Sequence, residues 1–195
     1  MSRSNSIPQL EAPGAGLPAP VLFVARRLFA FKCRFGKREA FSAEFEAERQ
    51  AIRDLVQSCG ADQLSRRVLV PRLRGLEDSS RFYSVWMTLD HLRITNLGFA
   101  KIIEELVDGR TPDFVVSTAD VKPDPNVRSE VADAYEQSCE HLLETLRRTG
   151  DLHTAVKHPH PWFGPLNAYR WLALAAMHMG IHRKQIATIL KRLPG

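Results

Sequence analysis

Apolar residues recur every three or four positions along most of this chain, the spacing that places them on one face of an α-helix. The pattern is longest in residues 41–57, 81–107, 127–148 and 167–192. A shorter segment, residues 21–34, precedes them. Gly36 can interrupt a helix, so residues 21–57 form either one broken helix or two helices. Alternation with a period of two never extends far enough to predict a sheet. The pattern therefore predicts an all-α protein, a four-helix bundle with an extended first-helix region.

The segments outside these helices are rich in residues that end helices. Four of the 12 prolines fall within residues 1–20, where we expect a flexible N-terminal tail. The connector before the third segment contains Pro71 and Gly75, and we expect one of Asp78, Ser79 or Ser80 to cap a helix that begins near residue 81. Residues 21–195 are few enough to form a single domain.

Composition and charge exclude only a few classes of function. The formal net charge is +5, but the basic residues are dispersed, so we interpret most of the excess as solvated surface. The apolar run that begins at Val21 is interrupted by Arg26 and Arg27, which excludes a signal peptide and a membrane span of about 20 residues. We therefore expect a cytoplasmic protein without membrane contact. Three cysteines without a C-x-x-C motif argue against a disulfide framework and a zinc finger.

The last predicted helix contains two histidines, His178 and His182, four residues apart. This spacing stacks their imidazoles one turn apart on one face, and such a pair can chelate a divalent ion. His91 lies in another predicted helix, so three rings can surround one metal if the two helices pack together. The same spacing also occurs in helices that bind no metal. No H-E-x-x-H motif is present, so the general base that this motif supplies is absent.

Neighbouring residues could orient the three rings or line a pocket. Trp171 and Gln185 share the helix face of the histidine pair, and Thr88 and Thr95 share the side of His91. Asp90 is a poor partner, because it points about 100° away from its neighbour around the helix. We expect the other histidines to be structural or on the surface: His158 and His160 in the proline-rich loop before the last helix, and His141 and His153 elsewhere.

Three fragments carry a resemblance to a known family. They are residues 84–92, which end in Asp-His-Leu, the loop His-Pro-Trp-Phe-Gly-Pro-Leu at 160–166, and residues 171–186 with the His-x-x-x-His pair. Their order and spacing resemble the DinB/YfiT-like superfamily. The resemblance implies an up-down-down-up four-helix bundle and one metal held by three histidines, which fall on His91, His178 and His182. The chain departs from the usual pattern between Gly36 and Ser80, a region on which the mouth of the pocket and the choice of substrate depend.

These observations predict a metal-binding protein. Relatives include thiol-dependent transferases and isomerases, so the resemblance implies a metal-dependent enzyme that acts on a small molecule, by hydrolysis or by transfer of a small thiol. Zinc, nickel and iron all suit imidazole ligands. One alternative is a non-catalytic binding module stabilised by the metal. Nucleic-acid binding is least favoured, because residues 180–192 resemble a recognition helix only faintly. Relatives often pair, so a homodimer is a further expectation.

Overall fold

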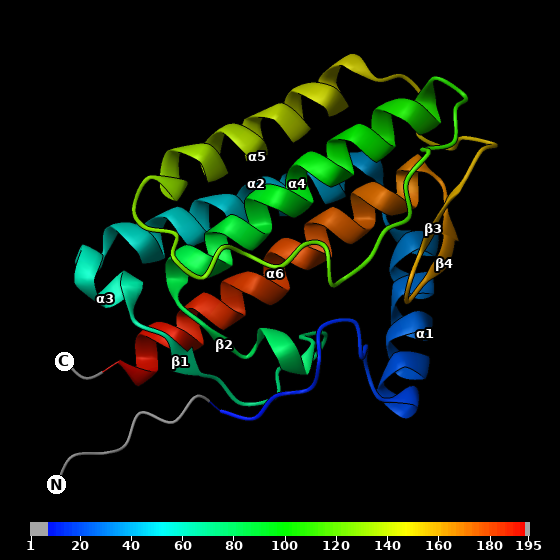
Figure 1. Cartoon of the computed structure of the whole chain (residues 1–195). Helices are drawn as coiled ribbons and strands as arrows, with labels where there is room; N and C mark the ends of the chain where they lie inside the picture. Colours follow the sequence, from blue (N-terminus) through cyan, green and yellow to red (C-terminus); the bar gives the residue numbers. More distant parts are fainter. Residues whose placement is uncertain (1–7, 194–195) are drawn as a thin grey trace, which may run out of the picture.

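The computed structural model describes residues 8–193, and almost all of their regular structure is helical (Figure 1). The helices are α1 (Ala19–Phe35), α2 (Arg38–Gln57), α3 (Ala61–Ser65), α4 (Val85–Val107), α5 (Val131–Arg148) and α6 (Ala168–Arg192). The short strands are β1 (Val68–Leu69), β2 (Phe82–Tyr83), β3 (His158–His160) and β4 (Gly164–Leu166), and a 3₁₀ turn, η1, spans Asp78–Ser80. The predicted all-α fold is confirmed, because the strands form only two small antiparallel pairs, β1–β2 and β3–β4.

The four long helices α2, α4, α5 and α6 form a bundle in which α2 and α6 run one way and α4 and α5 the other (Figure 1). Contacts agree with these directions. Thr145 in the last turns of α5 donates a hydrogen bond to Glu104 near the end of α4 (3.1 Å), as expected for parallel neighbours. Because α4 and α5 are parallel, residues 108–130 must return along the length of the bundle, and this crossing loop passes over α6 in Figure 1. The order is therefore up-down-down-up.

The bundle core is mainly apolar, and most of its buried polar side chains lie on α4 and α6. Large side chains such as Phe45, Ile52, Leu92, Leu142 and Trp171 are fully or almost fully buried and fill the space between the helices. The inner faces of α4 and α6 also bury polar side chains, which are Thr88, Asp90, His91, Thr95, Asn96, His182 and Gln185. Burial of a polar group costs free energy unless the group has hydrogen-bond partners. Polar residues therefore occupy positions here at which apolar side chains would stabilise the bundle by hydrophobic burial.

Side-chain caps decide where two of the bundle helices begin. The predicted start of α4 near residue 81 is wrong, because Phe82 and Tyr83 pair with β1 and Ser84 caps the helix by accepting a hydrogen bond from the Met87 amide (3.1 Å). The residues expected to cap it, Asp78 to Ser80, form η1 instead. Asn167 caps α6 in the same way as Ser84 caps α4, accepting from the Arg170 amide at 3.1 Å. The helix predicted at residues 127–148 begins four residues late, at Val131.

The chain before α1 lies against the connector between α3 and α4. Residues 1–7 of the predicted tail lie outside the described residues. The next residues have no helix or strand, but the amides of Gly14 and Gly16 both donate to Glu77 Oε1 at 3.1 Å, and the Glu11 amide donates to Asp78 at 3.0 Å. The two glycines adopt positive φ angles of 87° and 79°, which other residues rarely adopt. This part of the predicted tail is thus hydrogen-bonded to the fold.

Helix α1 is separate from α2 and projects away from the bundle (Figure 1), so residues 19–57 form two helices rather than one broken helix. Tyr169 ties its end to α6 by donating to the carbonyls of Cys33 and Gly36 (3.2 and 2.8 Å). Phe29 packs against Phe163 in the β3–β4 hairpin, with ring centroids 4.5 Å apart. Among the described residues, no helix combines the length and apolarity needed to cross a bilayer.

Candidate metal centre

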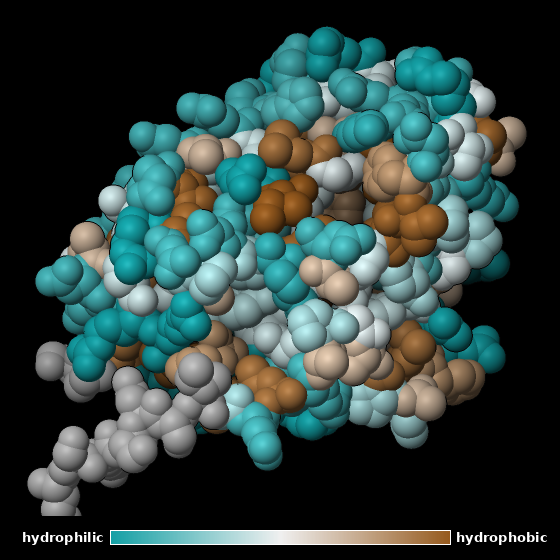
Figure 2. Space-filling model, in the orientation of Figure 1, coloured by the Kyte–Doolittle hydropathy of each residue, from teal (hydrophilic) through white to brown (hydrophobic). Residues whose placement is uncertain are grey.

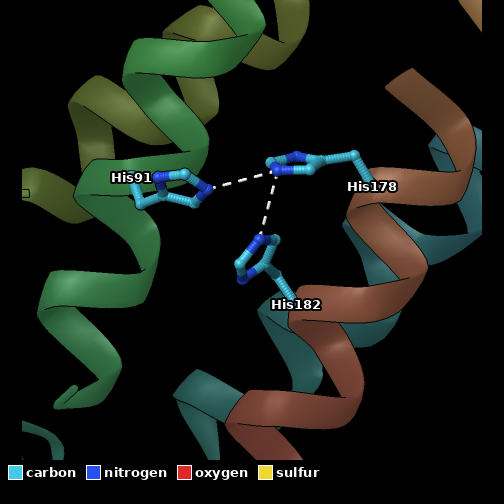
Figure 3. Close-up of side chains that lie close together, drawn as sticks. All are labelled: His91, His178 and His182. Carbon is cyan, nitrogen blue, oxygen red and sulfur yellow. Dashed lines mark hydrogen bonds between the residues drawn. The ribbon is translucent and has the colours of Figure 1, made fainter. Parts of the chain in front are cut away.

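The three histidines singled out in the sequence meet in the core of the bundle (Figure 3). His91 comes from α4, and His178 and His182 come from successive turns of α6. Nε2 of His178 lies 3.2 Å from Nε2 of His91 and 3.1 Å from Nε2 of His182. Within residues 8–193 this is the one group of three or more histidine, cysteine or acidic side chains whose ligand atoms all come within 4.8 Å of one another. The Nε2 atoms of the three rings therefore converge on a common point.

Burial keeps these imidazoles in the neutral form that binds metals. His91 and His182 are buried, and His178 is the most exposed of the three. Burial lowers the pKa of His91 to about 4. Burial also lowers the pKa of His178 and of His182 well below the usual value, and repulsion from the other imidazoles lowers both further. At neutral pH the rings are thus uncharged and able to donate lone pairs.

The crossing loop fixes the orientation of His91. Its Nδ1 lies 2.7 Å from the carbonyl oxygen of Val121. A carbonyl can only accept, so Nδ1 carries the proton and Nε2 presents its lone pair to the site. The loop is held there by Asp90, whose carboxylate accepts from the Asp124 amide (2.8 Å) and pairs with Arg93 (2.8 Å). Asp90 makes no hydrogen bond to the ring, as expected, but it anchors the loop that does.

The orientation of His182 is fixed by Gln185, as the sequence predicted for a supporting residue. His182 Nδ1 lies 2.7 Å from Gln185 Oε1, and the Gln185 amide nitrogen donates to the Ser80 carbonyl at 2.7 Å. The second bond identifies which end of the amide is the oxygen, so His182 also has its proton on Nδ1 and its lone pair on Nε2. Lys122 from the crossing loop donates to the Ser80 hydroxyl (3.1 Å) and to Glu77 (2.7 Å). It thus links the loop that supports His91 to the residue, Ser80, that holds Gln185.

With these tautomers, the three rings have too few N–H protons for His178 to hydrogen-bond to both of the other rings. The Nε2 atoms of His91 and His182 both present lone pairs toward His178 Nε2, which has at most one proton and can donate to only one of them. A cation held by all three nitrogens resolves the conflict. Zinc with nitrogen ligands at about 2.0–2.1 Å in a tetrahedral arrangement holds them about 3.3 Å apart, close to the two distances observed. The donor set therefore fits a divalent transition metal.

The other residues predicted near the site have different roles. The hydroxyls of Thr88 and Thr95 donate to carbonyls of their own helix, at Ser84 and at His91, rather than to an imidazole ring. Trp171 is fully buried and lies behind Phe99, whose ring meets His178 edge-on at 5.6 Å. The two threonine hydroxyls are thus bonded within the helix that carries His91, and Trp171 forms part of the wall around His178.

Several buried polar atoms beside the centre have no hydrogen-bond partner within residues 8–193. They are Nδ1 of His178, Nε1 of Trp171 and both ring nitrogens of His158. His158 and His160 lie beside Trp171, with ring centroids 6.1 and 5.5 Å from it, so the proline-rich loop packs against the wall of the site. By contrast, none of the three histidines lines the cavity of about 350 Å³ where the end of α1 and the start of α2 meet residues 151–153 and Tyr169.

The fold agrees with the comparisons with known proteins. The family model of the DinB superfamily matches residues 44–186, a segment that contains all three histidines. This chain belongs to the DinB superfamily. Among solved structures it is similar to TT2238, a four-helix bundle protein, with 22% sequence identity and a TM-score of 0.55 over 76% of this chain and 96% of that one. At that identity the likeness shows the fold alone. No curated protein matches the chain.

Within the DinB superfamily fold, two supports of the candidate centre had no signal in the sequence. The Val121 and Ser80 groups that fix His91 and His182 are backbone carbonyls, which every residue has. Only the crossing loop and the η1 turn bring them to the rings. Gln185 could be predicted because it lies one turn from His182 on the same helix.

Proposed function

We propose that this protein binds one divalent transition-metal ion through His91, His178 and His182 and uses it to transform a small molecule. The observation that carries the proposal is the convergence of three Nε2 atoms, two with lone pairs fixed by hydrogen bonds on their far sides. Membership of the DinB superfamily, which is often metal-binding, supports it independently. The donor set suits zinc, nickel and iron.

Three protein ligands leave coordination positions for a reactant, as in catalytic rather than structural zinc sites. When bound, the ion would supply Lewis acidity that can activate water or a small thiol near neutral pH. The chain's own residues hold the rings: Val121 and Gln185 keep the Nδ1 protons of His91 and His182, which fixes both tautomers before a ligand arrives. No carboxylate belongs to the cluster among the described residues. Because a bound ion of this kind activates water or a small thiol, hydrolysis or thiol transfer is the reaction class that we propose.

The surroundings of His178 support a small-molecule ligand. His178 is the most exposed of the three rings, so a reactant would approach from its side. The buried nitrogens of Trp171 and His158 have no partner within the described residues, and an unpaired buried polar group costs about 1–3 kcal/mol. These atoms are sealed from solvent, so a ligand with hydrogen-bonding groups bound at the histidines would pair with them only after the surrounding side chains move. Phe99 would provide an apolar contact beside it.

The test is metal content combined with activity. Purified protein, and metal-free protein reloaded with zinc, nickel or anaerobic iron, should contain about one ion per chain. His178→Gln should lose it, while His141→Gln, a change at an exposed histidine of α5, should not. The reloaded protein should then turn over a substrate in a panel of hydrolase and thiol-transferase assays, and His178→Gln should not.

The two halves of the proposal can fail separately. A wild-type chain that takes up none of the three metals while remaining folded would overturn the metal site. A protein that binds one ion per chain but is inactive with every substrate class would favour the alternative, a metal-stabilised binding module without turnover.

A further inference from the structure

Helix α1 exposes an apolar face that nothing in the described structure covers. Six of the nine large hydrophobic side chains exposed among residues 8–193 belong to this one helix of 17 residues, with exposed fractions between 44 and 64%. They are Val21, Phe23, Val24, Leu28, Phe31 and Phe35. Figure 2 shows brown, hydrophobic side chains gathered at the lower right, where Figure 1 places α1. Exposed patches of this kind mark interaction sites.

Five of these side chains form one continuous stripe. They follow each other at intervals of three and four residues, which keeps them on one side of the helix. We call Val21, Val24, Leu28, Phe31 and Phe35 the α1 stripe. The edge that faces the rest of the protein is a different one, with Phe29 and Cys33 buried. The α1 stripe is therefore not a core face that the fold has failed to cover.

Basic residues border the α1 stripe. The helix contains Arg26, Arg27, Lys32 and Arg34, and no acidic residue occurs between Glu11 and Glu39. Lys32 pairs with Glu44 at 2.6 Å. Arg27 and Arg34 form no ion pair within residues 8–193, and each lies over a phenylalanine of the same helix (5.3 and 5.7 Å from the ring centroids). The side of the stripe occupied by these two arginines thus has unneutralised positive charge.

The charge decides between the two occupants that such a stripe could accept. The intervals of three and four also suit a coiled coil with a second copy. In an antiparallel pairing Arg27 and Arg34 would face arginines of the partner, and like charges there destabilise a coiled coil. In a parallel pairing Arg27 would face Lys32, which already pairs with Glu44, and α1 has no acidic residue to stabilise either arrangement. An anionic surface with an apolar interior would instead accept both the phenylalanines and the arginines.

We propose that α1 docks this protein on an anionic lipid surface, with the α1 stripe inserted at the boundary between headgroups and acyl chains. A helix with phenylalanine and leucine on one face and arginines beside it is suited to lie in this interface. Arg27 and Arg34 would contact lipid phosphates, and the bundle would remain in water because α1 projects from it. The helix lies outside residues 44–186, so this inference does not depend on the proposed metal chemistry. It revises our expectation of no membrane contact, which considered only spanning segments.

The test is co-sedimentation of the full-length protein with vesicles of phosphatidylcholine alone and of phosphatidylcholine mixed with phosphatidylglycerol. We expect binding to the mixed vesicles and much weaker binding to the neutral ones. The double variant Arg27→Gln/Arg34→Gln should weaken binding to the mixed vesicles by about 30-fold. The double variant Leu28→Ser/Phe31→Ser should reduce it at least as much, because it removes the inserting side chains.

Matched controls separate the helix from general properties of the surface. Leu97→Ser removes an exposed leucine of α4, and Arg66→Gln/Arg128→Gln removes two exposed arginines outside α1, so both should bind vesicles like wild type. All substituted side chains are exposed, and circular dichroism should confirm unchanged helix content. Absence of binding to the mixed vesicles would overturn the proposal. So would a lipid-independent dimer, measured by light scattering, that Leu28→Ser/Phe31→Ser abolishes while vesicle binding is absent, since a second copy would then occupy the stripe.

Discussion

Gln185 joins a proposed metal ligand to the connector, and its replacement tests whether that connection matters. Its side chain is fully buried and makes two hydrogen bonds of 2.7 Å, to His182 Nδ1 and to the Ser80 carbonyl. Gln185→Leu preserves approximate size but leaves both partner groups buried without a bond. Each loss costs about 1–3 kcal/mol, so we expect the free energy of unfolding of the metal-free protein to fall by about 2–6 kcal/mol.

The same variant should bind metal more weakly for a separate reason. Without Gln185 the tautomer and rotation of His182 are no longer fixed, and loss of such a support typically reduces metal affinity about 10- to 100-fold. Competition with a chromophoric chelator near neutral pH measures the affinity, and urea denaturation of the metal-free protein measures the stability. Gln185→Glu is the matched control, because its carboxylate still accepts from His182 but cannot donate to Ser80.

The two variants separate orientation from packing. We expect Gln185→Glu to lose stability while keeping metal affinity close to that of wild type, and Gln185→Leu to lose both. If Gln185→Leu bound metal as tightly as wild type, the reasoning that Gln185 orients His182 would be refuted, and its bonds would be only part of the fold.

Two further predictions concern the stability of the bundle and its pH dependence. Ser84→Ala removes the acceptor that caps α4 at the Met87 amide, so urea denaturation should show a loss of about 1–2 kcal/mol. Burial lowers the pKa of His160 to about 4 from its ordinary 6.5, so the unfolded chain takes up its proton at a higher pH than the folded protein does. The stability contributed by neutral His160 is therefore complete above pH 6.5 and is lost as the pH falls toward 4, by up to about 3 kcal/mol. Denaturation of His160→Gln across that pH range should show a smaller loss than wild type; an equal loss would assign the acid sensitivity to other groups.

The hydrophobic pattern predicted the helices better than their ends or their directions. An apolar stripe specifies that a helix is buried on one side, but it is the same whichever way the helix runs, so the parallel arrangement of α4 and α5 followed only from the family resemblance. The start of α4 was misplaced because several polar residues precede it that are all suitable caps. Pairing of Phe82 and Tyr83 with β1, a contact distant in sequence, leaves Ser84 as the cap.

The sequence predicted which side chains could form the candidate site, but not how the helices that carry them pack together. His178 and His182 are neighbours by helix geometry alone, whereas their approach to His91 depends on how α4 packs against α6. Local sequence also gives no indication of whether a stripe will be covered. The segment of α1 had the same periodicity as the core helices, and only the structure shows that Phe23, Phe31 and Phe35 are exposed.

The central claim is that three imidazole nitrogens from two helices hold one ion, and X-ray absorption at the edge of the bound metal tests it most directly. We predict a first shell with three imidazole nitrogens, at about 2.0–2.1 Å if the ion is zinc. In His91→Gln, measured with metal supplied in excess to keep the weakened site occupied, the same spectrum should lose one imidazole. A shell dominated by sulfur or carboxylate oxygen, or one that His91→Gln leaves unchanged, would contradict the account.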